Sequence, residues 1–181
     1  ASPLLPSPAH QVIVPSPRSR FGLPDGVPLL ASFNNTYKLS GALVAAWAQI
    51  LDQCEGAYLA IYALQPAREG ILRSFGAAGG DVQRVVFMEN IDHASNLQRM
   101  QCCDLMLDAF DYNAGATAID AIAAELPILC LAGTTPLSRM SASINHYLEM
   151  HELICASPGS YVEKAVSFIT NPAEMELSLI H

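Results

Sequence analysis

The sequence has 181 residues, of which 51% are hydrophobic and 14% charged, and its net charge is −8. A chain of this length forms one domain with a substantial core, and it has no apolar run long enough to cross a bilayer. The acidic balance argues against binding to the phosphate backbone of nucleic acids. We expect no signal peptide, because no basic start and apolar run open the sequence.

Cysteine and histidine spacing argues against a metal site. The sequence holds five cysteines and five histidines, with no CxxC pair at zinc-like spacing and no HExxH pattern. Most of the cysteines lie within apolar segments, which predicts reduced core residues in a cytoplasmic protein.

Both ends of the chain differ from the rest. Seven of the twelve prolines lie within residues 1–28, a density that prevents a regular helix or an internal strand. We therefore expect residues 1–20 to form a Pro-rich linker or extended arm, joined to something upstream. Residues 173–181 form an acidic tail without a clear partner, either a frayed terminus or the stump of a longer helix.

Between these ends, apolar strands alternate with amphipathic helices. In chain order we predict a strand at 29–33, a helix at 41–53, a strand at 58–64, a helix at 67–77, a strand at 85–88, a helix at 94–102, a strand at 105–109, a helix at 117–124, a strand at 127–131, a helix at 138–148, a strand at 152–156 and a helix at 161–170. The strands are continuously apolar, as expected when helices cover both faces of a sheet. The fold class is therefore α/β, a Rossmann-like, doubly wound parallel sheet.

Ligands bind such sheets beyond the carboxyl ends of the strands, so the loops there are candidate sites. The first, residues 32–39, contains Asn35 and Lys38, one of only two lysines in the chain. In one interpretation Lys38 binds a diphosphate and Asn35 hydrogen-bonds the same ligand. In the other, the loop is a polar turn that caps the next helix.

The second loop, residues 110–117, leads into a helix. Small residues at 114–116 let the backbone approach a ligand, and the helix offers free N–H groups and its positive dipole end to phosphate. Asp120 is placed to accept hydrogen bonds from ribose hydroxyls, although Asn113 and Thr117 are also ordinary capping residues. The pattern is neither a GxGxxG fingerprint nor a Walker loop, which disfavours NAD and ATP.

The remaining polar positions are less specific. Arg139, after a Gly-Thr-Thr turn, either faces a ligand or pairs with a surface acid. His93 directly precedes the helix predicted at 94–102, and Arg99 lies within it; a lone histidine at a helix start is most often solvated or capping. Asp108 and Asp111 are explained most simply by turn formation. We expect no catalytic residue, since no nucleophile–base pairing is visible.

Taken together and in order, four segments resemble one known family. They are RSRFGLPDG (18–26), SFNNTYKL (32–39), CCDLMLDAFDYNAGATAIDAIAAELPIL (102–129) and GTTPLSRMSAS (133–143). They are similar to the C-terminal catalytic lobe of O-linked N-acetylglucosaminyltransferases and their bacterial homologues, glycosyltransferase family 41. The resemblance extends from about residue 18 to residue 172.

This resemblance implies the C-terminal half of a GT-B fold, with residues 21–172 as the lobe that binds the nucleotide sugar. The family's enzymes are inverting and metal-independent, need no cofactor, and transfer a sugar from a nucleotide donor to a protein side chain. The implied donor is a UDP-sugar, UDP-GlcNAc in the first instance, and the acceptor is a protein. The implied further partners are an N-terminal GT-B lobe and TPR repeats, and the lobe is expected to be inactive alone.

The same resemblance implies roles for individual residues. Lys38 corresponds to the family's phosphate-binding lysine, and Asn35 occupies the nearby position at which the family carries a glutamine. The segment Gly115-Ala116-Thr117 stands where members carry His-Thr-Thr or Gly-Thr-Thr beside the diphosphate. Asp120 corresponds to the aspartate that meets the ribose, and Arg99 to an arginine flanking the donor pocket.

Three departures from the family pattern leave alternatives open. Ala116 lacks a hydroxyl, His93 stands where the animal enzymes carry a lysine, and Asn96 where they carry a histidine. A hydrogen bond to a charged group contributes about 1.5–3 kcal/mol, so two such losses would weaken donor binding roughly a hundredfold. The chain could instead be a degenerate, non-catalytic interaction domain, or a lobe of another GT-B enzyme such as a nucleotide-sugar epimerase.

Overall fold

The computed structural model describes residues 13–171 and residue 173, so the first twelve residues of the expected arm and nearly all of the expected tail lie outside it. The strands are β1 (Leu29–Ser32), β2 (Tyr58–Tyr62), β3 (Val85–Met88), β4 (Leu105–Leu107), β5 (Ile128–Leu131) and β6 (Ile154–Cys155). The α-helices are α1 (Gly41–Gln53), α2 (Gln65–Ala77), α3 (His93–Met100), α4 (Ala116–Ala123), α5 (Met140–Tyr147) and α6 (Pro158–Thr170). Short 3₁₀-helices are η1 (Arg18–Phe21), η2 (Thr36–Lys38), η3 (Val82–Arg84), η4 (Leu137–Arg139) and η5 (His151–Leu153).

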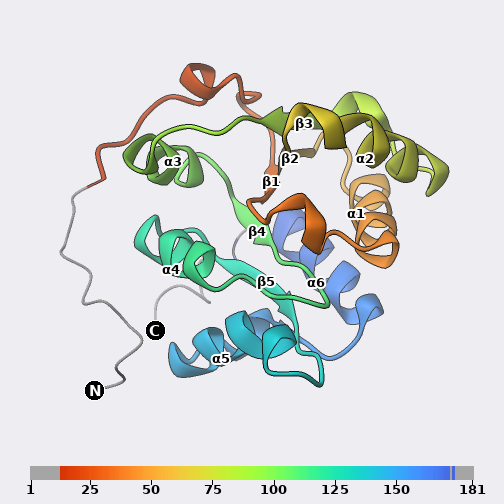
Figure 1. Ribbon diagram of the computed structural model, residues 1–181, viewed down its shortest axis with the longest axis vertical. Helices are drawn as coiled ribbons and strands as arrows, with labels where there is room; N and C mark the ends of the chain where they lie inside the picture. The colour runs from red at the N-terminus through yellow and green to blue at the C-terminus, as the bar shows by residue number, and fades with distance from the viewer. Residues whose placement is uncertain (1–12, 172, 174–181) are drawn as a thin grey trace.

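The six strands form a parallel sheet in the order β3-β2-β1-β4-β5-β6, which confirms the predicted doubly wound fold (Figure 1). β1 is central, pairing Leu29 with Tyr58 of β2 and Leu30 with Leu105 of β4. The strand order reverses between β1 and β4, and a crevice for ligands opens at such a reversal.

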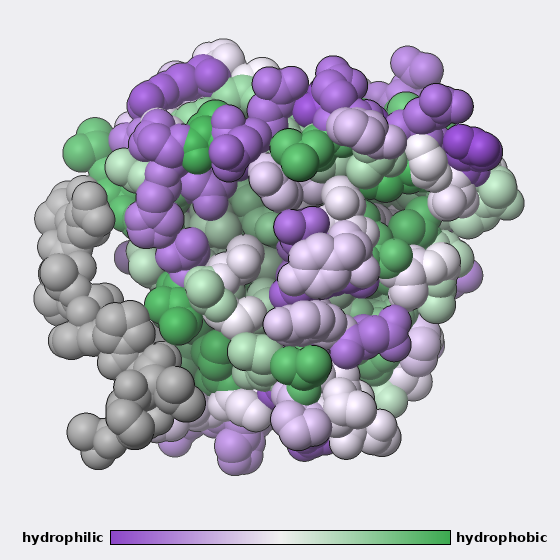
Figure 2. Space-filling model, viewed as in Figure 1, coloured by the Kyte–Doolittle hydropathy of each residue, from purple (hydrophilic) through white to green (hydrophobic). Residues whose placement is uncertain are grey.

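Helices cover both faces of the sheet because successive strand side chains point to opposite faces. Leu30 belongs to a core with Trp47 and Phe168, under α1, α2 and α6. Leu29 and Ala31 belong to the opposite core, which α3 and α4 cover. Figure 1 shows this division, with α1, α2 and α6 on one side of the strands and α3 and α4 on the other. On the face seen in Figure 2, hydrophobic residues are scattered among polar ones rather than gathered in one patch.

Most element boundaries differ from the predicted ones by one to three residues, and three of these differences have a clear local cause. The predicted helix 138–148 begins only at Met140, because residues 137–139 form η4. The predicted strand 152–156 is reduced to two residues by η5 before it. The helix predicted from residue 67 begins at Gln65 with Pro66 in its first turn, where the missing proline N–H has no helical acceptor.

The η1 segment crosses the predicted boundary at residue 20 and is fastened to the sheet. Arg18 Nε donates to the carbonyl of Cys102 at 2.7 Å, and its Nη2 donates to both carboxylate oxygens of Asp104, at 3.2 and 3.1 Å. Asp104 also accepts from the backbone N–H of Leu29 at 2.7 Å. Arg18 thus ties η1 to the amino ends of β1 and β4, and the boundary itself stays a prediction.

The cysteines are core residues, as expected. Cys54, Cys102, Cys103, Cys130 and Cys155 are all buried and free. Burial raises the pKa of the Cys130 thiol to about 12 and that of Cys155 to about 11. No helix within residues 13–171 is long and apolar enough to span a membrane, and the same residues contain no cluster of three metal-ligating side chains.

Candidate functional site

A pocket of about 250 Å³ lies at the carboxyl edge of the sheet, at the reversal of strand order. The residue after β1, the end of β2, the loop after β3, and helices α3 and α4 contribute its walls. The lining residues are Phe33, Tyr62, Asn90, Ile91, His93, Asn96, Arg99, Thr117 and Asp120. Four of the residues expected at a donor site, far apart in the sequence, therefore meet in one pocket.

Arg99 is the buried cation of this pocket. Only 4% of the residue is exposed, and its Nη atoms donate to the Glu89 carbonyl at 2.8 Å and to Oδ1 of Asn96 at 2.6 Å. Its Nε has no hydrogen-bond partner, and its guanidinium lies 5.7 Å from the Phe33 ring centroid. Burial lowers the pKa of Arg99. Because it forms no ion pair with any described residue, Arg99 is suited to an acceptor-rich ligand.

His93 and Asp120 both line this pocket and contact each other. His93 Nε2 lies 2.9 Å from Oδ1 of Asp120. His93 begins α3, where the Asp92 carboxylate accepts from the N–H of Ser95 at 2.9 Å and caps the helix. That hydrogen bond lowers the pKa of Asp92. The histidine therefore engages one carboxylate oxygen of Asp120, and a ligand would have to share this side chain with it.

Lys38 lies beside the loop that leads into α4. Its Nζ donates to the Asn113 carbonyl at 3.1 Å, two residues before Gly115, which caps α4. Burial lowers the pKa of Lys38, and the nearby Asp108 carboxylate partly offsets this. A Cβ on Gly115 would lie 2.6 Å from Cε of Met140, so the turn and α5 pack closely there. Lys38 and the free N–H groups at the start of α4 thus share one edge of the sheet.

Lys38 and Gly115 do not line the pocket themselves, and two further expected site residues, Asn35 and Ala116, also lie outside its lining. Asn35 is exposed at the start of η2 and makes no side-chain capping bond. Ala116 is exposed in the first turn of α4, directly before Thr117. The loop of Arg139 closes on itself, with the guanidinium donating to the Gly133 carbonyl at 3.0 Å, so Arg139 joins neither the pocket nor a surface acid.

Asp108 connects more of the site than the turn formation expected from the sequence. It is fully buried and accepts from Asn34 Nδ2 and the Ala109 N–H at 2.8 Å each, from the Ala114 N–H at 2.9 Å, and from the Ser141 hydroxyl. Burial raises its pKa, and these hydrogen bonds partly oppose the rise. The expected turn-forming role is confirmed by the bonds to Ala109 and Ala114, but Asp108 also joins the ends of β1 and β4 to α5. The sequence signal for this wider role was an ionisable residue at the end of an apolar strand.

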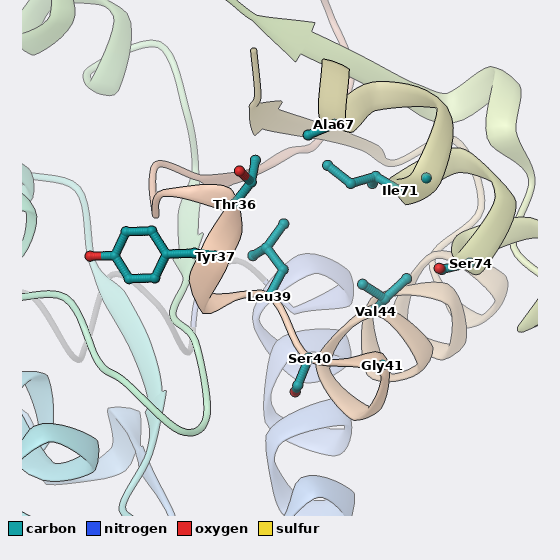
Figure 3. Close-up of a pocket in the computed structure, with 10 residues that line it drawn as sticks. Thr36, Tyr37, Leu39, Ser40, Gly41, Val44, Ala67, Ile71 and Ser74 are labelled. Carbon is teal, nitrogen blue, oxygen red and sulfur yellow. The ribbon is translucent and has the colours of Figure 1, made fainter. Parts of the chain in front are cut away.

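A second pocket, of about 430 Å³, lies beside the first turn of α1 (Figure 3). Leu39 and Val44 form one wall, and Ala67 and Ile71 of α2 form the other. Tyr37 also lines the pocket, and Figure 3 shows its ring pointing away from Ile71. The lining is apolar and hydroxyl-bearing and holds no carboxylate, histidine or cationic side chain, so Tyr37 is its one titratable group.

Comparison with known proteins places this site in a family context. The model of glycosyl transferase family 41 matches residues 7–178. The chain belongs to glycosyltransferase family 41. It is 28% identical over 165 residues to the probable UDP-N-acetylglucosamine–peptide N-acetylglucosaminyltransferase SEC of Arabidopsis thaliana, covering 88% of this chain and 16% of that protein. It is 25% identical over 155 residues to the corresponding enzyme of Caenorhabditis elegans, covering 85% of this chain and 14% of that protein.

Solved structures with the same fold include two nucleotide-sugar enzymes. The O-GlcNAc transferase of Thermobaculum terrenum matches with a TM-score of 0.85 at 19% identity, covering 98% of this chain and 33% of that one. UDP-GlcNAc 2-epimerase of Neisseria meningitidis, bound to UDP-GlcNAc, matches with a TM-score of 0.64 at 13% identity, covering 90% of this chain and 41% of that one. These likenesses confirm the expected fold, one Rossmann-like lobe of a GT-B architecture.

Proposed function

We propose that this chain is the donor-binding lobe of an inverting protein glycosyltransferase that uses a UDP-sugar, with UDP-GlcNAc as the donor. The observation that carries the proposal is the single pocket that joins Arg99, Thr117 and Asp120 at the reversal of strand order, with Lys38 beside the start of α4. Family membership supports the same conclusion.

In this proposal each group has a separate task. Arg99 faces the nucleoside, and Asp120 accepts hydrogen bonds from ribose hydroxyls with the oxygen that His93 leaves open. Lys38 and the first N–H groups of α4 hold the diphosphate. When the sugar leaves, negative charge develops on the diphosphate, and a fixed ammonium and a helix N-terminus stabilise that charge. The chain's own contribution to catalysis is therefore leaving-group stabilisation.

The remaining parts of the reaction belong to other segments of a longer protein. This chain spans 16% of the Arabidopsis relative, and within it we assign no general base or acceptor site. We propose that residues 21–172 are the donor lobe, that residues 1–20 connect it to an N-terminal GT-B lobe preceded by TPR repeats, and that the lobe is inactive alone. A protein acceptor would bind between the two lobes.

Two features favour a second candidate, a non-catalytic interaction domain. His93 engages Asp120 at 2.9 Å, and Ala116 provides no hydroxyl at the start of α4. Both features reduce what the site offers to a nucleotide sugar. The two candidates differ in a simple observable, the binding of UDP.

Calorimetry and amide NMR on the 181-residue chain with UDP and UDP-GlcNAc test the proposal. We expect binding of both, and at least tenfold weaker binding in Lys38→Met and Asp120→Asn, since each removes a group placed on the ligand. Arg73→Ala, on the exposed face of α2, is the matched control. An NMR spectrum unchanged by millimolar UDP and UDP-GlcNAc would reject a donor lobe in favour of the interaction domain. Product analysis of the longer protein separates transfer to protein from epimerisation.

A further inference from the structure

The ammonium of Lys38 is held between an aromatic ring and a backbone carbonyl. Its Nζ lies 4.0 Å from the centroid of the Tyr112 ring and donates to the Asn113 carbonyl at 3.1 Å. The ring of Tyr37 meets Tyr112 edge-on, with centroids 6.2 Å apart and planes at 62°. Both partners of the ammonium belong to the loop between β4 and α4, so this loop fixes where the charge lies.

Neither partner neutralises the charge. The face of an aromatic ring and a carbonyl oxygen attract a cation, yet they carry no net charge. No carboxylate among the described residues lies within ion-pair distance of Lys38. Asp108 acts on Lys38 through space, and both of its carboxylate oxygens already accept hydrogen bonds. An ammonium has three N–H donors, so donors remain for an incoming anion after the Asn113 carbonyl has taken one.

The loop that carries the ring is firmly anchored. Asn113 is fully buried, its backbone N–H donates to the Leu137 carbonyl at 2.9 Å, and its Nδ2 donates to the Ala109 carbonyl at 2.7 Å. Tyr112 directly precedes this fixed residue and is itself half-buried. The ring is therefore a preformed surface for the lysine.

We propose that Tyr112 is a positioning residue for the diphosphate site: its ring face holds the Lys38 ammonium beside the start of α4 without neutralising it. This inference rests on the function proposed above, in which Lys38 binds the diphosphate. A lysine already confined in the free protein loses less conformational freedom when an anion binds. The attraction depends on the ring face and not on the hydroxyl, so phenylalanine should replace Tyr112 while an aliphatic side chain should not.

The test compares UDP with uridine, which lacks the diphosphate, on the 181-residue chain. A cation over an aromatic face contributes about 0.5–2 kcal/mol, which corresponds to roughly 2- to 30-fold in affinity. Tyr112→Leu should weaken UDP binding within that range and leave uridine binding unchanged, while Tyr112→Phe should keep the wild-type affinity. Tyr147→Leu, an exposed tyrosine that ends α5, is the control. Tyr112→Met provides a second non-aromatic variant, and thermal unfolding verifies that each protein is folded.

A double-mutant cycle shows whether Tyr112 acts through Lys38. In a Lys38→Met background, Tyr112→Leu should have no further effect on UDP affinity. The inference is overturned if Tyr112→Leu and Tyr112→Met bind UDP as the wild type does, if they weaken UDP and uridine equally, or if their effect persists without Lys38. Loss of UDP binding in Lys38→Met with none in the Tyr112 variants would reject only the positioning role. A wild-type chain that binds no UDP would reject the proposed function as well.

Discussion

Removing the Asp108 carboxylate should destabilise the fold more than any other single carboxylate loss in the same loop. Asp108→Ala leaves four donors without their acceptor: the N–H groups of Ala109 and Ala114, the Asn34 amide and the Ser141 hydroxyl. A buried donor left unsatisfied costs about 1–3 kcal/mol. If rearrangement satisfies two of the four, the remaining two cost about 4 kcal/mol, and losing a desolvated charge returns part of this, so about 3 kcal/mol remains. For a domain of this size that corresponds to a fall in Tm of about 10 °C.

Thermal and urea denaturation of Asp108→Ala, Asp108→Asn and the wild type measure this effect. Asp111→Ala is the matched control, because Asp111 is exposed in the same loop, and a surface substitution of this kind changes stability by less than about 0.5 kcal/mol. Burial raises the pKa of Asp108 above 3.8, so the folded state binds this proton more tightly than the unfolded chain does. Its contribution to stability therefore falls as pH rises from about 4 through the raised pKa, and both variants should lack that fall. An Asp108→Ala protein within 1 kcal/mol of the wild type would refute the reasoning.

Three further predictions concern single side chains. Ala116→Thr adds a hydroxyl at the start of α4 and should strengthen UDP binding by about tenfold in calorimetry, the value of one hydrogen bond to a charged group; unchanged affinity would mean that the diphosphate does not reach this turn. Burial lowers the pKa of Lys38 below 10.5. As pH rises through this lowered pKa the ammonium loses its proton, so UDP affinity should begin to decline before pH 10.5 is reached, and Lys38→Arg should show no such decline. Arg18→Ala breaks the pairing with Asp104 and the hydrogen bonds from the guanidinium to the carbonyls of Pro24, Val27 and Cys102, and should lower the free energy of unfolding by about 2–3 kcal/mol in urea. The exposed control Arg73→Ala should change it by less than about 0.5 kcal/mol, and equal effects of the two would refute the anchoring role of η1.

The fold was predictable because its signals are local. Continuously apolar strands such as Tyr58–Tyr62 and the amphipathic helix Gly41–Gln53 need little context to be recognised. Boundaries were less predictable where side chains form local hydrogen bonds. Thr135 and Ser138 bond each other's side chains and backbone groups, and this network delays the start of α5 until Met140.

The site was predictable to the extent that it follows strand ends and the family pattern. Lys38, Arg99 and Asp120 were expected, and they do lie at the carboxyl edge of the sheet. The contact between His93 and Asp120 was not expected, because it depends on the distance between α3 and α4. The hydrogen bonds to Asp108 depend in the same way on where the loops after β1 and β4 meet, which no sequence spacing states.

The position of β1 in the sheet has a consequence for how the protein folds. Its first neighbour, β2, follows it closely in the chain, whereas β4 enters only at Leu105, which pairs with Leu30. Until that segment has been synthesised, one edge of the central strand stays open, and pairings between such distant residues form slowly. In chain order the sheet therefore has an early half, β1 to β3, and a late half, β4 to β6, and the two halves pair through β1 and β4. The pocket draws Arg99 from the early half and Asp120 from the late one, so a bound ligand would act as a non-covalent cross-link that stabilises the joined halves against separation.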